Sequence, residues 1–302
     1  MNAVLGTLLD PIVPVFAIMA VGFAMGRAGL LAVAEARTLN RVVMAVFLPI
    51  LLFDLTSTAR LDAFRLPPVL IYFAAEMTML ALGFALGRLV FRLSAAESFL
   101  LAFGAIFTNT VMYVLPLSRL IHGAEAALPV ASIVTLDSTL VFALAIVTTQ
   151  LLTREAHPRA AAAAIARNPI IVAIVLGLAV NLAGLPLPAP LATFVGFNGA
   201  AAPPLALFAL GVVMSATTLR IDGVVATFAA VKMIALPLAV FTGLQLLAPA
   251  EPAKGLFVFV AAGPSGAMAF TLALLHQVPH ERVGRLILVT SVLTLASLAV
   301  LA

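Results

Sequence analysis

The feature that most constrains this chain is a succession of long apolar segments separated by short charged or Pro/Gly-rich joints. A helix needs about 20 apolar residues to cross the hydrocarbon core of a bilayer. Ten segments have the required character, at residues 7–26, 38–57, 68–90, 97–121, 128–151, 168–185, 199–218, 224–247, 255–275 and 283–301. Helices satisfy their own backbone hydrogen bonds in lipid. The sequence therefore predicts an all-α polytopic membrane protein with ten transmembrane helices.

The composition excludes several other classes of protein. Hydrophobic residues make up 64% of the chain and charged residues 9%, which is more apolar surface than a soluble fold can bury. The formal charge of +4 comes from cations in short joints, so we expect the lipid bilayer as partner and no nucleic acid. Cysteine is absent, which excludes disulfides and cysteine-ligated metals. No Lys or Arg precedes Arg27, so we expect the first segment to be retained.

The distribution of cations predicts how the chain is oriented. If the joints alternate sides, one side holds eleven of them: Arg27, Arg37, Arg41, Arg88, Arg92, Arg154, Arg159, Arg167, Arg220, Arg282 and Arg285. The other side holds four: Arg60, Arg65, Arg119 and Lys254. Cytoplasmic joints carry the excess of Lys and Arg. We therefore expect a multi-pass protein of the bacterial cytoplasmic (inner) membrane with both termini in the periplasm.

The two halves of the chain resemble each other weakly. A shift of 155 residues superposes four Gly or Pro positions: Pro14 on Pro169, Gly22 on Gly177, Gly29 on Gly184 and Pro49 on Pro204. Each half holds five segments, and an odd number of crossings forces the second copy to enter from the opposite side. The sequence predicts inverted five-helix repeats at 1–152 and 168–302, joined by a short cytoplasmic linker at 153–167.

Polar, proline-containing stretches interrupt the fourth and ninth segments. A proline inside a helix removes a hydrogen bond and costs about 3 kcal/mol. Paired interruptions in corresponding halves are typical of a transporter's binding site, where half-helix N-termini favour an anion. The alternative is a pair of structural kinks. We predict a substrate site at Thr108, Asn109, Thr110, Pro116, Gly263, Pro264, Ser265 and Gly266.

Three charged residues fall well inside apolar segments, namely Glu76, Asp137 and Lys232. A charge at such a depth costs roughly 2.5 to 3.5 kcal/mol and is functional by default. We predict that the three form a cluster in which Lys232 is neutralised by one of the carboxylates and which couples charge movement to transport. The alternative is a buried structural ion pair.

The sequence offers no constellation for catalysis or metal binding. Ser265 lacks the G-x-S-x-G spacing of a nucleophile elbow, and no His lies within a segment to act as its base. The four histidines fall in joints or at segment ends, without an H-E-x-x-H motif. We expect no enzyme activity, no metal and no cofactor.

Short motifs in a constant order give the chain a resemblance to bacterial members of the auxin efflux carrier family, which includes malonate carriers. They are residues 22–31, Leu39-Asn40-Arg41, residues 48–53, Asn109-Thr110 with residues 115–117, Asn168-Pro169, residues 204–211, Lys232 with Leu236-Pro237, and Pro264 with residues 267–273. The chain differs at Ala267-Met268, where many relatives carry Asn. The family belongs to the wider group that contains the bile-acid/sodium symporters.

The resemblance implies a scaffold from helices 1, 2, 6 and 7 and a transport domain from helices 3–5 and 8–10, with broken helices 4 and 9 crossing in it. It also implies an elevator-type motion, a homodimer through the scaffold, and organic anions as substrates. We therefore expect a secondary active transporter of a mono- or dicarboxylate, with a proton or sodium as coupling ion. The alternatives are a sodium-coupled symporter of the bile-acid carrier type, and a passive channel or membrane sensor.

The orientation can be tested with single cysteines at Ala3 and Ala302, since the chain has none of its own. Both should react with a membrane-impermeant thiol reagent in intact spheroplasts, because the excess of cations lies on the other side. Protection of both cysteines until the cells are lysed would contradict the predicted orientation.

Overall fold

The computed structural model describes residues 17–59, 61, 65–110, 114, 118, 127–153, 167–216 and 221–301. Every regular element in these ranges is a helix, and the one β-type pairing among them is an isolated bridge between Thr108 and Ser265. The predicted all-α fold is therefore confirmed for the described residues. Pro116 and most of the linker predicted at 153–167 lie outside them.

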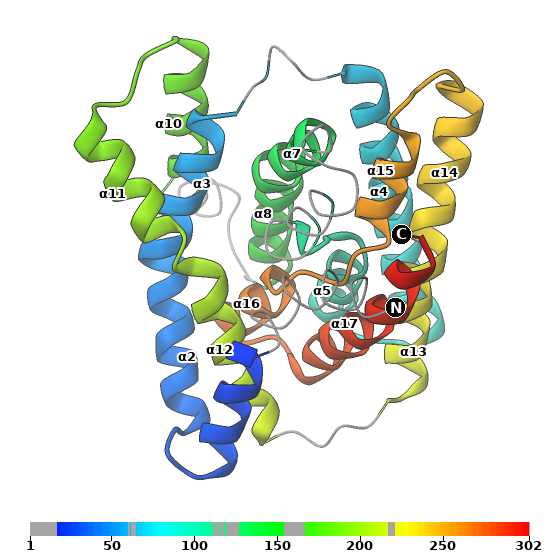
Figure 1. Cartoon of the computed structure of the whole chain (residues 1–302). Coiled ribbons are helices and arrows are strands. Elements are labelled where there is room, and N and C mark those ends of the chain that lie inside the picture. Colours follow the sequence, from blue (N-terminus) through cyan, green and yellow to red (C-terminus); the bar gives the residue numbers. More distant parts are fainter. Residues whose placement is uncertain are drawn as a thin grey trace.

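One set of helices, here called the outer group, packs around α3 at one side of the molecule (Figure 1). It comprises the helix Ala17–Arg27, α2 (Val33–Val42), η1 (Val43–Phe47), α3 (Leu48–Ser57), α10 (Pro169–Leu182), α11 (Ala189–Gly199) and α12 (Ala202–Ser215). Segments from both halves of the sequence thus lie side by side.

Close backbone approach holds α10 against α3. A Cβ at Gly177 would lie 1.9 Å from the Thr56 hydroxyl oxygen, so only glycine allows this separation. Four residues later, the Asn181 amide group donates to the backbone oxygens of Thr56, Ser57 and Ala59 at 3.0, 3.1 and 2.7 Å. These bonds satisfy carbonyl groups that the C-terminal end of α3 leaves without helical partners.

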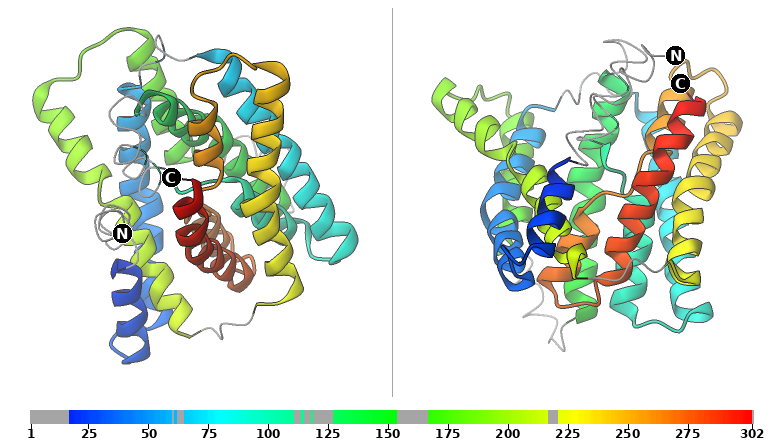
Figure 2. Two further views of the ribbon diagram at one scale, coloured as in Figure 1. Left: turned by 45° about the vertical axis from the view of Figure 1, so that its right-hand side comes forward. Right: turned by 60° about the horizontal axis from the view of Figure 1, so that its bottom comes forward.

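The other helices form a second set, here called the crossing group. It comprises α4 (Leu66–Ala85), η3 (Leu86–Val90), α5 (Ala95–Ile106), α7 (Ala127–Leu136), η6 (Asp137–Val141), α8 (Phe142–Thr153), α13 (Gly223–Ala230), η7 (Val231–Ala235), α14 (Leu236–Leu247), α15 (Lys254–Ala261), α16 (Met268–Leu275) and α17 (Glu281–Leu301). The views in Figure 2 show α16 and α17 between the outer group and α14.

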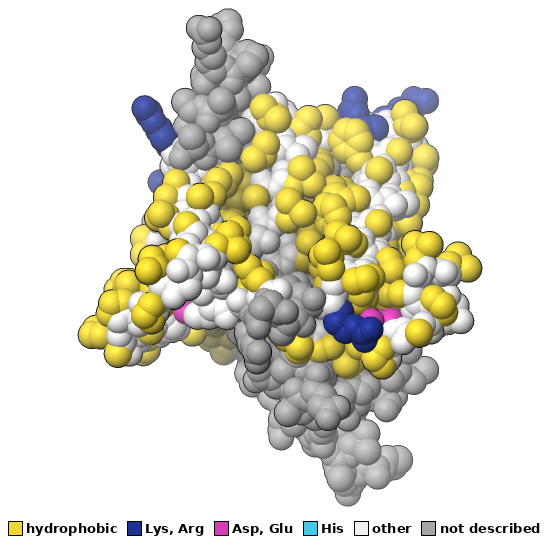
Figure 3. Space-filling view, turned by 90° about the horizontal axis from the view of Figure 1, so that it is seen from above, with side chains coloured by type: hydrophobic (Ala, Val, Ile, Leu, Met, Phe, Trp, Pro, Cys, Tyr) yellow, Lys and Arg dark blue, Asp and Glu magenta, His cyan; other side chains and the backbone are white. Residues whose placement is uncertain are grey.

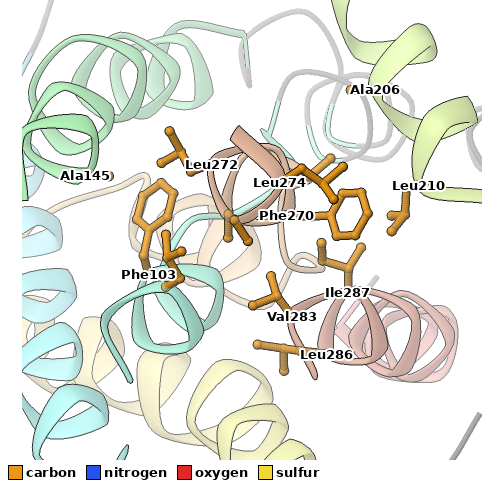
Figure 4. Packing of buried hydrophobic residues seen from close by; sticks show 14 of the residues in the cluster. Phe103, Ala145, Ala206, Leu210, Phe270, Leu272, Leu274, Val283, Leu286 and Ile287 are labelled. Carbon is orange, nitrogen blue, oxygen red and sulfur yellow. The ribbon is translucent and has the colours of Figure 1, made fainter. Parts of the chain in front are cut away.

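Helix packing in the crossing group is centred on α5 and α16. Figure 4 shows Phe103 of α5, Phe270 of α16 and Leu286 of α17 in the same apolar cluster. All three side chains are almost completely buried, with 1% or less of their surface exposed. This core surrounds the point at which the fourth and ninth segments are interrupted.

An ion triad ties three helices together at one end of the crossing group. The Arg282 guanidinium contacts Glu97 of α5 at 2.8 Å and Asp222, the N-cap of α13, at 3.1 Å. Burial alone would raise the pKa of Asp222. The hydrogen bond from the Val225 amide and the Arg282 charge outweigh burial, so the pKa lies below its usual range.

Five helices in the described ranges are long and apolar enough to cross a membrane: Val33–Ser57, Leu66–Val90, Leu128–Thr153, Ala189–Ser215 and Gly223–Leu247. Large apolar side chains lie exposed on the outside, such as Leu89 at 78% and Phe197 at 80%, and they cover much of the face in Figure 3. Such a surface suits lipid rather than water. The count of ten helices and the inverted repeat stay predictions.

The predicted boundaries differ most at the seventh segment. The helix begins at Ala189 instead of residue 199 and bends where α11 ends at Gly199 and α12 starts at Ala202. Pro190 suits the first turn of α11, and Pro203 suits the first turn of α12. Because both helices begin with a proline in the first turn, the segment boundaries drawn from apolar length alone missed α11.

The outer and crossing groups meet along a boundary to which α2, α12, α16 and α17 contribute. The Asn40 amide group of α2 donates to the Thr271 oxygen of α16 at 3.3 Å. Nearby, Gly284 of α17 lies against Met214 of α12, where an added Cβ would come within 2.8 Å of the Met214 sulfur. α3 contacts η6 along the same boundary.

Candidate functional site

The two interrupted segments meet and hydrogen-bond to each other. The Asn109 amide donates to the Pro264 oxygen at 2.8 Å, and the Gly266 amide donates to the Phe107 oxygen at 2.8 Å. Between these bonds Thr108 and Ser265 form an antiparallel bridge. Each broken helix thus satisfies backbone groups that the other has left without helical partners. The structure brings the two predicted interruptions together at one place.

Glycine permits this close crossing. A Cβ at Gly263 would lie 2.5 Å from a methyl carbon of Val114 and 2.7 Å from the Thr108 methyl carbon. A Cβ at Gly266 would lie 2.8 Å from the Phe107 ring. Any larger residue must therefore push the two breaks apart.

A cavity of about 80 Å³ lies between this crossing and the outer group. Its walls are mainly apolar, with polar groups from the crossing: Leu48, Leu51, Leu52, Leu55, Phe107, Thr108, Asn109, Thr110, Val134, Asp137, Ser138, Phe142, Pro203, Leu207, Gly266, Ala267 and Met268. One water molecule needs roughly 10–15 Å³ of such cavity volume. The cavity therefore has room for about five to eight water-sized groups.

The N-terminal end of α16 opens onto the cavity. Residues 266–268 line it, and the first intrahelical bond there runs from the Thr271 amide to the Ala267 oxygen. The first amides of any helix have no intrahelical acceptor, and they carry the positive end of the helix dipole. This end of the cavity favours a negatively charged group.

Lys232 is completely buried behind the crossing and bonds to both broken segments. Its ammonium donates to the Thr108 hydroxyl at 2.5 Å and to the Ala261 oxygen at 3.0 Å. Thr108 belongs to the first break, and Ala261 is the last residue of α15 before the second. The position of this cation therefore depends on both interruptions.

Glu76 and Asp137 lie near Lys232 and are themselves almost completely buried, at 0% and 3% exposed. Each interacts electrostatically with the other and with the lysine. Among the described residues, none of their four carboxyl oxygens has a hydrogen-bond donor. A proton held between two carboxyl groups supplies such a donor. Asp137 also lines the cavity, so this cluster borders the place that a ligand can occupy.

The residues predicted from the sequence divide between two positions. Thr108, Asn109, Thr110 and Gly266 line the cavity, whereas Gly263, Pro264 and Ser265 lie in the crossing outside its lining. Pro116 lies outside the described residues.

The three predicted charges lie near one another, and Lys232 interacts electrostatically with both carboxyl groups. The ion pairs within 4.0 Å among the described residues do not include Lys232. The hydroxyl of Thr108 and the carbonyl of Ala261 hold the ammonium instead.

Two residues of the site were missed by sequence reasoning. Tyr72 precedes Glu76 by one turn on α4, is fully buried, and interacts electrostatically with Glu76 and Asp137. The Thr290 hydroxyl of α17 accepts the Ser265 amide at 3.1 Å. The four-residue spacing between Tyr72 and Glu76 puts both on one face of a helix, so the sequence could have indicated Tyr72. Thr290 is far away in sequence and has no such signal.

Comparison with known proteins identifies relatives of this chain. A family model described as Membrane transport protein matches residues 7–161 and 154–302. The chain is also 28% identical over 268 residues to a protein of Rhizobium meliloti (strain 1021) named "Putative malonate transporter". That alignment covers 86% of this chain and 83% of the relative.

Replacing Gly263 with Ala should separate the two breaks, because the added methyl group would collide with Thr108 and residue 114. Overpacking of this kind costs about 1–3 kcal/mol, so the melting temperature of the purified protein should fall. Gly255→Ala on α15 is the matched control, since nothing lies within 4 Å of its added Cβ. Equal melting temperatures for the two variants would contradict the assigned role of Gly263.

Proposed function

The chain belongs to the membrane transport protein family, the auxin efflux carrier family, and from this premise we propose that it is a secondary active carrier of a small organic anion. The observation that carries the proposal is the pair of interrupted helices, hydrogen-bonded to each other beside an internal cavity and a buried lysine. Irregular backbone within lipid is tolerated where it is buried in protein or lines a cavity. A transport role also fits the lack of a catalytic constellation among the residues at the crossing.

The size and polarity of the cavity support a small carboxylate as substrate. Space for about five to eight water-sized groups suits a three-carbon diacid, which has seven non-hydrogen atoms. The amides at the start of α16 offer donors to one carboxylate group, and the Asn109 side chain on the opposite break offers another polar contact. Apolar walls from α3 then face the carbon skeleton. The name of the Rhizobium meliloti relative agrees with this substrate class.

The charge cluster supports coupling to a proton. An anion in the cavity would lie next to Asp137, and two negative charges at such a distance in a site with little water repel strongly. A proton on the Glu76–Asp137 pair lowers its charge from −2 to −1 and so weakens that repulsion. Binding of the anion and binding of the proton should therefore favour each other, so substrate affinity should rise as the pH falls.

Sodium coupling receives less support. A sodium ion at crossed broken helices needs oxygen ligands from both interruptions. Here the Lys232 ammonium already donates hydrogen bonds to two such oxygens, one from each interrupted segment. We propose that this tethered cation stands where a symporter of the bile-acid type would hold a sodium ion. Uptake into proteoliposomes should then be independent of sodium.

The division into two groups supports an elevator-type motion. In this proposal the outer group acts as the scaffold, through which two copies would pair, and the crossing group carries the substrate. The contacts across their boundary include a long hydrogen bond from Asn40 to Thr271 at 3.3 Å, which is weak enough to break when one group slides past the other. A passive channel or a sensor is the alternative, and a channel would conduct without the saturable exchange expected of a carrier. We place the protein in the bacterial cytoplasmic membrane.

Replacing Asn109 with Ala tests the substrate site. The change removes a hydrogen-bonding group from the cavity wall and should weaken carboxylate binding by about 1–3 kcal/mol. Binding can be measured as ligand-induced thermal stabilisation of the purified protein against a panel of carboxylates. Asn198→Ala is the control, because that side chain is partly exposed on α11 and bonds to the Phe194 oxygen of its own helix. Wild-type affinity in Asn109→Ala would count against this assignment.

Replacing Lys232 with Met tests the charge cluster. The variant should be destabilised, because it leaves Glu76 and Asp137 buried without a compensating cation. Adding Asp137→Asn or Glu76→Gln should restore the melting temperature. If the carboxylates carry the coupled proton, transport by the double variants should lose its dependence on pH. If uptake by both double variants still depends fully on pH, the cluster has a structural role and does not couple protons to transport.

A further inference from the structure

A second hollow lies at the opposite end of the boundary between the outer and crossing groups. Its volume is about 340 Å³, and it is lined by Val33, Arg37, Val213, Ala216, His280, Glu281 and Arg285. Val33 and Arg37 come from α2, Val213 and Ala216 from the end of α12, and the others from the start of α17. We call it the boundary cleft. It shares no lining residue with the central cavity.

The boundary cleft is wide enough for a ligand. Small-molecule sites typically have volumes of about 300–1,000 Å³. An adjoining hollow of about 340 Å³ shares Arg37, His280 and Glu281 with it and continues past Gln277. The cleft therefore has a volume at the lower end of the range for ligand sites and opens at the end of the molecule that the cation pattern assigns to the cytoplasm.

Two arginines from different groups line this cleft, Arg37 from α2 and Arg285 from α17. Glu281 is the acidic residue in the lining, so the lining carries net positive charge even when His280 is neutral. Among the described residues Arg37 forms no ion pair within 4.0 Å. An anion placed between the two guanidinium groups would be attracted to both.

The chemistry of the lining suits an oxyanion. A guanidinium group presents a planar fork of N–H donors that matches carboxylate and phosphate groups. His280 adds a ring nitrogen, and its ring is held edge-on against Phe270 at 5.8 Å between centroids. Burial, together with the charge of Arg37, lowers the pKa of His280, while Glu281 acts in the opposite direction. The ring is therefore neutral at neutral pH and adds no charge to the lining.

We propose that the boundary cleft is a second anion site, which holds a carboxylate or phosphate group between Arg37 of α2 and Arg285 of α17. Such an anion comes either from the aqueous phase, as a free carboxylate, or from the headgroup of an acidic lipid. Because its ligands belong to both groups, a bound anion ties α2 to α17. It would hold this end of the boundary closed and so oppose the sliding of the crossing group.

The test measures malonate binding by calorimetry to the full-length protein in an uncharged detergent. Asn109→Ala weakens the central site, so the remaining binding reports the boundary cleft. Adding Arg37→Gln should weaken that remaining binding about tenfold or more, because a charge-assisted hydrogen bond is lost. Adding Arg41→Gln is the matched control: Arg41 lies one turn further along α2 and lines neither hollow.

Two results would overturn the proposal: equal malonate affinity in the Arg37→Gln and Arg41→Gln backgrounds, or complete loss of binding in Asn109→Ala alone. If Asn109→Ala changes nothing while Arg37→Gln removes a binding event, the cleft stands and the central site does not. Each variant must elute as one species and keep the parent melting temperature, and Arg37→Lys, which keeps the charge, should restore part of the binding.

The source of the anion is found by repeating the titration in lipid nanodiscs with and without phosphatidylglycerol. If the acidic lipid prevents malonate binding only when Arg37 is present, the headgroup occupies the cleft. If the acidic lipid has no effect, the cleft takes the free carboxylate. Both results support an anion site, and they identify its ligand class.

Discussion

Two backbone hydrogen bonds between chain segments that are about 155 residues apart hold the centre of this protein together, from Asn109 to Pro264 and from Gly266 to Phe107. An unpaired amide or carbonyl group costs several kcal/mol in hydrocarbon, so one broken helix by itself would be a liability. Two broken helices that pair with each other remove most of that cost. The cavity, the α16 N-terminus and the Lys232 site all exist because the backbone leaves its helical path at this crossing.

The buried charges depend on the same crossing. Lys232 has one hydrogen bond to each interrupted segment, so the ammonium is fixed only when the breaks are in register. It also offsets the negative charge of two carboxyl groups that have no hydrogen-bond donor in the part of the chain that the structure describes. Asp137 and Lys232 both lie in π-helical turns, η6 and η7, which interrupt the regular ladder of their helices. Such turns are frequent at functional sites because they re-aim a side chain without ending the helix.

The boundary between the outer and crossing groups connects the central cavity with the boundary cleft. The cavity has its apolar wall on α3 and α12, and the cleft has its wall on α2 and the far end of α12. Between them, Gly284 of α17 lies against Met214 of α12. Because ionisable residues line both hollows, a ligand bound in either one can shift the relative position of the two groups.

Length, apolar content and the spacing of charged joints determined the class of the protein, because an apolar segment of membrane length has few alternatives to a helix in lipid. The sequence also located both interruptions, since Pro264 and the Thr-Asn-Thr stretch are incompatible with an ordinary buried helix. It placed Glu76, Asp137 and Lys232 at similar depth.

The sequence did not determine the partners of these residues. Thr108 and Ala261 bind the lysine, and Thr290 bonds to Ser265, through contacts between residues far apart along the chain. Helix periodicity carries information about neighbours within a turn or two, whereas these contacts arise only when separate helices cross. Tertiary structure alone also brought Arg37 and Arg285 to one cleft, because a solvated charge at a helix end has no preferred partner until another helix is packed beside it.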